Sequence, residues 1–429
     1  MIEEDVSARL ALSRVTEPGD PRMGELLLAH EASHVWSLVR DAADEGSLRS
    51  VRALTTLADT LGYDSAQQRT GLAKWAQRWN ARMPAVDNER DLRAARTLGA
   101  HLLTPSHPHW PRRLDDLAET SPWLLWVRGK SSMVNADASV SIVGTRTPSA
   151  YGDYVAQAIL AGISTSKILV VSGGAYGIDA HVHRGSLEHN LPSVAVLAGG
   201  VDRLYPQGNK KLLQRLIDHG ALVSEMPVGV APSRVRFLRR NRIIAGLGDV
   251  TTVIEAAWRS GSLSTAHHAA GLGRAVMAVP GPVTSAQSAG CHRLIAEGYA
   301  ALLGHPADLE TIVNHRSSDR RERHADIGSD QRENSRAEPG VQRAGDMTGS
   351  HRQDDLFSRE SDSLHEGERL VYDALSPFRA RFIDDLVAAS GLSHLEVREI
   401  LGILELKQLV ICEQQGYRRV AENRSPGKY

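Results

Sequence analysis

The residues of this 429-residue chain best suited to chemistry are glycines, serines and an arginine that follow short apolar runs between Ser141 and Leu303. Glycine lets backbone N–H groups approach an anion, and the amino end of a helix favours negative charge. One such turn is often only geometric, but four of them on one edge predict a phosphate-binding rim. Its expected members are Gly144, Arg146 and Ser149 after the first strand, Ser172, Gly173 and Gly174 after the second, Gly199 and Gly200 after the third, and Gly261 and Ser262 after the fifth.

A basic cluster strengthens this prediction. It comprises Arg234, Arg236, Arg239, Arg240 and Arg242, with Phe237 and Asn241 between them, and Lys210 and Lys211 follow Asn209. A cluster of this kind can also be a plain solvated surface. Because the segment from Arg240 to Arg242 precedes an apolar run, we expect it at the start of a helix over 241–247, where caps and phosphate contacts are both plausible.

Other chemistries lack their motifs. The sequence has no G-x-x-x-x-G-K-[ST] and no G-x-G-x-x-G after the first strand, which argues against a P-loop and against the usual NAD site. Asp179, His181 and His183 are close enough in sequence to form an acid–base group, but we favour structural roles for them. The only cysteines, Cys291 and Cys412, are far apart, which argues against a disulfide framework or a zinc site. We therefore expect no cofactor and no metal.

The elements that must position the rim alternate regularly. Apolar runs predict strands, and helical patterns predict helices between them. This alternation predicts an α/β fold with a doubly wound, Rossmann-like, mostly parallel sheet, whose ligands bind at the carboxyl ends of the strands. The strands are expected at 140–143, 168–171, 194–197, 221–223, 250–254 and 275–279, and the helices at 151–163, from 178, and at 209–219, 241–247 and 264–272.

Composition divides the rest of the chain. Residues 1–98 read as a helical domain, with helices at 23–40, 48–61 and 72–79. A proline-rich connector and a strand at 124–129 lead into the sheet domain, which spans 99–304. Residues 305–364 are too polar to bury a core, so we expect a disordered linker. Helix–turn–helix and hairpin patterns over 365–421 predict a winged helix.

Charge and hydropathy add three expectations. The helix of the winged helix that would read DNA carries Glu396, Glu399 and Glu405 against Arg398, which favours a protein partner over a DNA duplex. The chain has a net charge of −1, so no global field steers its partners. It has no apolar run of membrane-spanning length and no signal-peptide pattern at its acidic start, so we expect a cytoplasmic protein without a membrane span.

Collinear motifs between residues 144 and 290 resemble the DNA-processing protein A (DprA/Smf) family. They are Gly144–Gly152, Ser172–Asp179, Tyr205-Pro206 with Asn209, Ser224–Pro227, Phe237–Leu247, Glu255-Ala256 with Ser260–Thr265, Gly273-Arg274, Val279–Gly281 and Ser288–Gly290. The resemblance implies a non-enzymatic homodimer that binds single-stranded DNA, protects incoming DNA in natural transformation and loads the RecA recombinase. It also implies, to be added to the rim, DNA contacts from Asn209, Lys210, Arg239, Arg240, Asn241 and Arg242. The helical N-terminal domain would be the SAM-like module of that family.

Two further hypotheses stay open. The Ser172–Ala175 turn also resembles nucleotide-monophosphate hydrolases of the lysine-decarboxylase-like group, although Pro280-Gly281 is followed by Pro282 and the Pro-Gly-Gly-x-Gly-Thr signature is missing. Glu255 is the only acid that we nominate for such an enzyme. The third hypothesis, compatible with the first, is a recombinase-loading adaptor whose terminal domains recruit partners. Base stacking on Tyr151, Tyr205 or Phe237 is an expectation that competes with ordinary packing.

Overall fold

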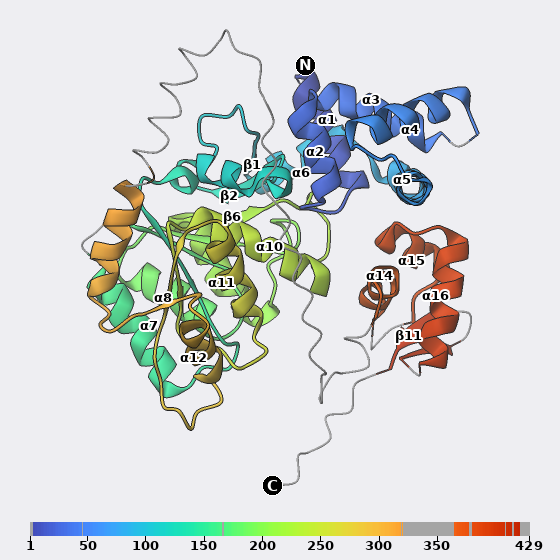
Figure 1. Cartoon of the computed structure of the whole chain (residues 1–429). Coiled ribbons are helices and arrows are strands. Elements are labelled where there is room, and N and C mark those ends of the chain that lie inside the picture. Colours follow the sequence, from blue (N-terminus) through green and yellow to red (C-terminus); the bar gives the residue numbers. More distant parts are fainter. Residues whose placement is uncertain are drawn as a thin grey trace. The chain divides into compact units, whose positions relative to one another are not determined.

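A computed structural model describes residues 3–44, 46–164, 167–318, 320, 364–376, 380–407, 409–413 and 416–420. The chain divides into two compact units, Met1–Ser317 and Ser318–Tyr429 (Figure 1). The first unit contains the N-terminal helices and the sheet, and the second contains the winged helix. Among the described residues, no helix has both the length and the apolar composition that crossing a membrane requires.

The first unit is built on a nine-stranded sheet with the order β1-β2-β6-β5-β4-β3-β7-β8-β9. All neighbours from β6 to β9 pair in parallel, and β1 and β2 extend the sheet with antiparallel pairs. The doubly wound parallel sheet is therefore confirmed, with two strands, β1 and β9, that the pattern did not predict. The strands are β1 (Ala100–Leu103), β2 (Leu125–Gly129), β3 (Ser139–Val143), β4 (Leu169–Ser172), β5 (Ser193–Val196), β6 (Ala221–Ser224), β7 (Val250–Val253), β8 (Ala275–Ala278) and β9 (Ala301–Leu302).

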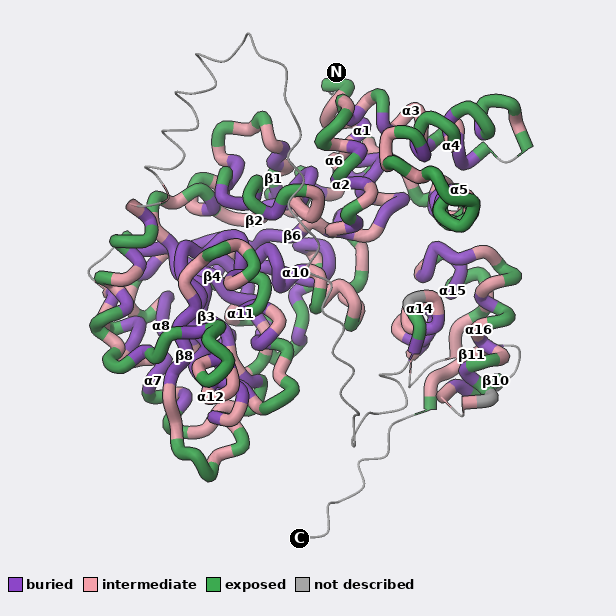
Figure 2. Tube along the Cα trace, viewed as in Figure 1, coloured by how far each residue is buried: buried purple, intermediate pink, exposed green. Residues whose placement is uncertain are grey.

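Helices cover both faces of this sheet, and Figure 2 shows the strands buried between them. Strand β3 illustrates the two layers, because alternate side chains of a strand point to opposite faces. Val140 and Ile142 pack with α7, α8 and helical residues 308–318, whereas Val143 packs with α10, α11 and α12. The helices around the sheet are α7 (Ala150–Gly162), α8 (Ile178–Glu188), α9 (Lys210–His219), α10 (Arg234–Leu247), α11 (Gly261–Gly271) and α12 (Ala289–Ala296).

The helical stretch at 308–318 corrects the predicted start of the linker at residue 305. Leu309 and Val313 are fully buried against the sheet, so this segment belongs to the first unit. The remainder of the predicted linker, 321–363, lies outside the described residues.

The N-terminal segment is helical, as predicted, but its first long helix is two helices. Extended backbone at His30 and Glu31 separates α2 from α3 where a single helix over 23–40 was expected. Trp75 and Trp79 are buried in this segment, and Trp36 is partly buried at its edge. The helices are α1 (Glu4–Val15), α2 (Pro21–Ala29), α3 (Ala32–Ala43), α4 (Leu48–Thr60), α5 (Ala66–Arg82) and α6 (Asn88–Leu98).

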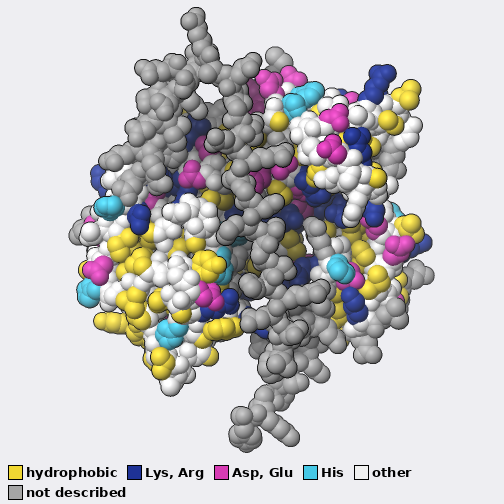
Figure 3. Space-filling model, viewed as in Figure 1, with side chains coloured by type: hydrophobic (Ala, Val, Ile, Leu, Met, Phe, Trp, Pro, Cys, Tyr) yellow, Lys and Arg dark blue, Asp and Glu magenta, His cyan; other side chains and the backbone are white. Residues whose placement is uncertain are grey.

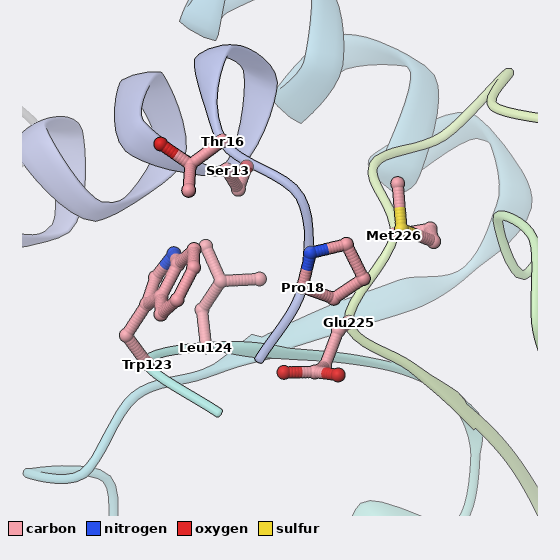
Figure 4. A pocket seen from close by; sticks show the side chains of 7 residues that line it. All are labelled: Ser13, Thr16, Pro18, Trp123, Leu124, Glu225 and Met226. Carbon is pink, nitrogen blue, oxygen red and sulfur yellow. The ribbon is translucent and has the colours of Figure 1, made fainter. Parts of the chain in front are cut away.

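The N-terminal helices share their core with the sheet. Trp123, Leu124 and Trp126 of the connector and β2 belong to the same buried cluster as the helices. Figure 4 shows this junction, where Pro18 after α1 lies beside Leu124 and beside Glu225 after β6, around a small cavity. The predicted boundary at residue 98 therefore falls inside one compact unit.

The second unit contains three helices and a hairpin, which confirms the predicted winged helix. The elements are α14 (Glu366–Ala374), α15 (Ile383–Ser390), α16 (His394–Leu406), β10 (Val410–Glu413) and β11 (Gly416–Arg419). Gly391 adopts φ +70° in the turn before α16, a conformation that favours glycine. Glu396 forms a capping box with Ser393 at the start of α16, whereas Glu399 and Glu405 are exposed.

Candidate nucleic-acid interface

A cleft of about 290 Å³ opens where β3 ends, between α10 and the amino end of α11. The loop after β3 and the loop after β4 also border it. Parallel strands bring their carboxyl ends to one edge, so loops that are distant in sequence meet there. Six of the predicted site residues line this cleft: Gly144, Arg146, Arg240, Asn241, Gly261 and Ser262.

Arg240 forms the floor of the cleft and is 7% exposed. Its Nη1 donates to the carbonyl oxygen of Gly173 at 2.6 Å and also to the carbonyl of Val196, and its Nε donates to the side-chain oxygen of Asn241 at 3.2 Å. Burial lowers the pKa of Arg240 to about 10, although Asp179 opposes this shift. Arg240 therefore remains a cation at neutral pH, held by carbonyl groups.

Asp179, in the first turn of α8, also lines the cleft. Its Oδ2 accepts hydrogen bonds from the backbone N–H groups of Gly173 at 3.2 Å and Ala175 at 3.3 Å. Burial raises the pKa of the Asp179 carboxyl, while Arg240 and the N–H donors act in the opposite direction. Asp179 thus orients the glycine loop after β4 and faces Arg240.

An aromatic ring and a second cation form one wall. The Arg146 guanidinium lies 5.5 Å from the ring centroid of Phe237, and the Arg240 guanidinium lies 5.6 Å from it. Tyr205, which is 50% exposed, places its ring 5.8 Å from that of Phe237. Two guanidinium groups beside an aromatic face supply both phosphate donors and a stacking surface. Tyr151 instead donates its hydroxyl to the carbonyl of Pro280 at 2.6 Å.

The amino end of α11 forms the opposite wall. Ser260 caps this helix by accepting from the N–H of Ser262, and the hydroxyls of these two serines are 2.7 Å apart. The carbonyl of Gly261 accepts from the side-chain amide of Asn241 at 3.2 Å, which ties α10 to α11. The positive end of the helix dipole therefore faces the cleft beside Arg240.

The glycine loop after β4 contacts Arg240 and helps to hold its guanidinium in place. A Cβ on Gly173 would lie within 2.6 Å of the guanidinium of Arg240, so a larger residue there would displace that group. The amide of Asn209 donates to the carbonyls of Gly174 at 3.0 Å and Ala175 at 2.9 Å. The hydroxyl of Ser172 donates to the carbonyl of Ile142 at 2.7 Å. Ser172, Gly173, Gly174 and Asn209 are thus placed to shape the loop, while Lys210 is exposed at the start of α9.

Ser149 and the buried Glu255 form a separate hydrogen-bonded pair beside the cleft. Ser149 caps α7 and gives its backbone N–H, at 2.9 Å, and its hydroxyl to the carboxylate of Glu255. Glu255 is 2% exposed. The acid that we nominated for the enzyme hypothesis therefore holds the loop after β3 in place.

The basic cluster is divided between two sides of α10. The helix begins at Arg234, with Ser233 as its cap, so the prediction of a start at Asn241 is wrong and the arginines lie within the helix. Arg239 donates to the carbonyl of Pro18 at 3.2 Å. Arg242 forms a two-point ion pair with Glu225, at 2.7 and 2.6 Å, and donates to the carbonyl of Thr120. These two predicted contacts point toward the N-terminal helices and the connector.

The histidines near Asp179 do not join it. His183 is fully buried with its Nδ1 2.9 Å from the hydroxyl of Ser193, and burial, assisted by Arg240, lowers its pKa to about 3. His181 pairs with Asp153 at 3.1 Å. Within the described residues, no group of three or more His, Cys, Asp and Glu side chains is arranged to hold a metal ion.

Sequence reasoning missed several lining residues, among them Thr145, Ser260 and Thr265. Ser260 and Thr265 belong to the Ser260–Thr265 turn of the predicted rim, but the sequence did not single them out. A signal that could have found Thr265 is helix phase, because it is four residues from Gly261 and residues three or four apart on a helix share one side. That signal requires the start of the helix, which the sequence did not define.

Comparisons with known proteins agree on one family. The family model described as DNA recombination-mediator protein A matches residues 101–314, and the one described as DprA winged helix domain matches residues 357–415. A DNA processing protein DprA of Mycobacterium tuberculosis (strain CDC 1551 / Oshkosh) is 37% identical over 355 residues, covering 80% of this chain and 83% of that protein. Protein Smf of Escherichia coli (strain K12) is 37% identical over 245 residues, covering 56% of this chain and 64% of that protein.

A solved structure agrees with these sequence matches. The X-ray structure of DNA processing protein A from Streptococcus pneumoniae superposes on this chain with a TM-score of 0.55 at 27% identity. The superposition covers 72% of this chain and 97% of that structure. The likeness therefore extends over the sheet and beyond it.

Proposed function

Because this chain belongs to the DNA recombination-mediator protein A (DprA/Smf) family, we propose that it binds single-stranded DNA in the cleft at the end of β3. One observation carries the proposal: Arg146 and Arg240 flank the ring of Phe237 opposite the amino end of α11. A cationic groove with an aromatic face is the arrangement that holds a phosphate and stacks a base.

The size and chemistry of the cleft favour a single strand over a duplex. A volume of about 290 Å³ is enough for roughly one nucleotide, not for a double helix. A single strand exposes its bases, so one base can stack on Phe237 or Tyr205 while its phosphate meets Arg146 or Arg240. Lys210, which is exposed at the start of α9, supplies a further cation for the phosphates.

We further propose that the chain acts without catalysis, loads a RecA-type recombinase onto the bound strand as in natural transformation, and works as a cytoplasmic homodimer. Support for the dimer comes from apolar side chains exposed around α12 and the edge strand β9. Hydrophobic side chains gather over this lower part of the sheet unit in Figure 3. Exposed apolar residues beside these elements are Trp258, whose ring centroid lies 5.1 Å from the guanidinium of Arg293 in α12, Tyr299 just before β9 and Leu302 within it.

The decisive experiment is fluorescence anisotropy of a labelled single-stranded oligonucleotide with the full chain at several salt concentrations. We expect affinity to fall with salt, because each neutralised phosphate releases counterions, with a slope of about −0.7 per phosphate contact. Unlabelled single strand should compete better than duplex of equal length. Binding that ignores salt, or a preference for duplex, would contradict the proposal.

The same protein also tests the enzyme hypothesis. Incubation with nucleoside monophosphates should release no free base, because Glu255 is engaged by Ser149. Release of free base would contradict the binding proposal and support the hydrolase hypothesis.

RecA loading is tested by strand exchange on single strands coated with single-strand-binding protein. The full chain should accelerate this exchange.

A further inference from the structure

Helix α10 carries two functional faces. A helix turns by about 100° per residue, so Arg236, Arg239 and Arg242 lie on one side, at intervals of three. Five residues of α10 line the cleft, and four of them lie on the other side: Phe237, Arg240, Asn241 and Ile244. The centres of the two sides are roughly 150° apart, and Leu238, the fifth lining residue, lies between them.

The loop between α1 and α2 contacts all three arginines of the first side. Glu17 accepts from Arg236 at two points, Nη2 at 2.8 Å and Nε at 3.1 Å. The carbonyl of Pro18 accepts from Arg239 at 3.2 Å. A Cβ on Gly19 would lie 2.6 Å from the Nε of Arg242, so the backbone passes directly over that side chain. Three consecutive residues of the loop thus follow one side of α10.

Glu17 also links α10 to the N-terminal helices. Its Oε1 accepts from Nη2 of Arg82, at the end of α5, at 2.9 Å. Burial opposes its ionisation, but Arg236 and Arg82 lower the pKa of Glu17 well below its usual value. The carboxylate is therefore charged at neutral pH and ties together two arginines from distant parts of the chain. Two-point contacts of this kind fix orientation as well as distance.

We infer that Glu17 is a positioning residue for the DNA cleft: by holding Arg236 it sets the rotation of α10, and that rotation places Phe237 and Arg240 toward the strand. The inference rests on the proposed function, since it assigns the N-terminal helices a part in single-strand binding. Because α10 is continuous, a turn on the Glu17 side must move the residues on the cleft side.

Charge alone and loss of positioning predict opposite changes in DNA affinity when Glu17 is neutralised. The substitution E17Q removes a negative charge near a cationic cleft, so simple electrostatics predicts tighter binding of DNA. Loss of positioning predicts weaker binding, because Phe237 and Arg240 lose their fixed orientation. The sign of the change in affinity therefore separates the two explanations.

The chain offers a matched control in Asp91 of α6. Asp91 is 2% exposed and accepts from Nε of Arg14 at 2.6 Å, and Arg14 also donates to the carbonyl of Val228 at 2.9 Å. D91N thus removes one buried negative charge at the same junction between the helices and the sheet unit, but through Arg14 rather than α10. A second test variant, R236K, keeps the charge and loses the two-point contact.

The experiment measures the full-length wild type, E17Q, E17D, R236K and D91N. Anisotropy with a labelled oligo-dT gives the affinity, and hydrogen exchange gives the protection of residues 234–242. We expect E17Q and R236K to weaken binding by about 2- to 30-fold and to raise exchange in α10. E17D keeps a carboxylate and should bind more tightly than E17Q but less tightly than the wild type. The affinity of D91N should stay within about twofold of that of the wild type.

Unchanged or tighter binding by E17Q and R236K would overturn the inference, and so would unchanged exchange in α10. R236K decides the matter if E17Q does not fold. If the wild type binds no single strand, the proposed function fails instead. Hydrogen exchange then still shows whether Glu17 holds α10, so the two failures are distinguishable.

Discussion

Two sides of one helix use arginine for different purposes. On one side of α10, Arg240 donates to the carbonyls of Gly173 and Val196 and faces the cleft. On the other side, Arg242 forms an ion pair with Glu225 in which both side chains are less than a tenth exposed. Both arginines belong to the same basic cluster, two residues apart. The position of an arginine around the helix, rather than the density of positive charge, therefore decides what it does.

The different partners explain why. A carboxylate such as Glu225 neutralises the charge of its arginine, and little field is left for a ligand. Arg240 donates its hydrogen bonds to uncharged oxygens, and Asp179 offsets its charge only through space, so more of its field is left for a ligand. The comparison predicts that losing the Arg242–Glu225 pair chiefly reduces stability, whereas losing Arg240 chiefly reduces DNA affinity. Arg236 differs from Arg242, because its contact with Glu17 sets the rotation of α10.

The largest effect is expected for R242M. Removing one partner of a buried ion pair leaves Glu225 without its cation, which costs about 3–5 kcal/mol of unfolding free energy. The folded protein should bind single strands as the wild type does. Urea denaturation measures the first quantity and anisotropy the second.

The double variant R242M/E225L is the control for that substitution. Replacing both charges with apolar groups should recover much of the lost stability. A loss of DNA affinity in R242M that the double variant does not recover would place Arg242 in the binding site and break the comparison.

The next largest effect is expected for R240Q. Hydrogen bonds to charged groups contribute about 1.5–3 kcal/mol, so the affinity for single strands should fall by about ten- to a hundredfold. Anisotropy at one fixed salt concentration measures the loss, with circular dichroism to verify the fold. Affinity equal to that of the wild type would mean that the floor of the cleft does not meet the phosphate.

The sequence predicted the sheet but not the phase of α10. Buried strands such as Val140–Val143 are nearly continuous apolar runs, and that signal is local, so their positions were predicted within a residue or two. The segment Arg234–Arg240 has four arginines among its seven residues, so its apolar pattern was too weak to predict this part of the helix. Its helical state depends on partners distant in sequence, such as Glu17, which is 219 residues from Arg236.

The residues of the candidate site could likewise be predicted only in part from the sequence. Gly144, Arg146 and Gly261 were predictable because strand ends of a parallel sheet meet at one edge. The separate roles of Arg240 and Arg242 were not, because they depend on where the helix starts. Glu225, which engages Arg242, gave no signal in the sequence beyond its place in a family motif.

F237A tests whether the aromatic wall holds a base. Loss of stacking should cost about 1–3 kcal/mol of binding free energy. Leu238 is the matched control, because it lines the same cleft, is 41% exposed and has no aromatic ring. Anisotropy should show a loss for F237A and little change for L238A. Equal losses would indicate that the wall contributes only apolar contact.

The smallest effect is expected for R146A, whose side chain is exposed beside Phe237. Stability should change by less than about 0.5 kcal/mol, because the side chain is on the surface. The slope of log affinity against log salt should become shallower by about 0.7, the share of one phosphate contact on a single strand. The control is R52A on the exposed side of α4, which should leave the slope unchanged. If R52A reduced the slope as much as R146A does, phosphates would contact the N-terminal helices as well. The cleft beside α10 would then be only one part of a longer DNA-binding surface.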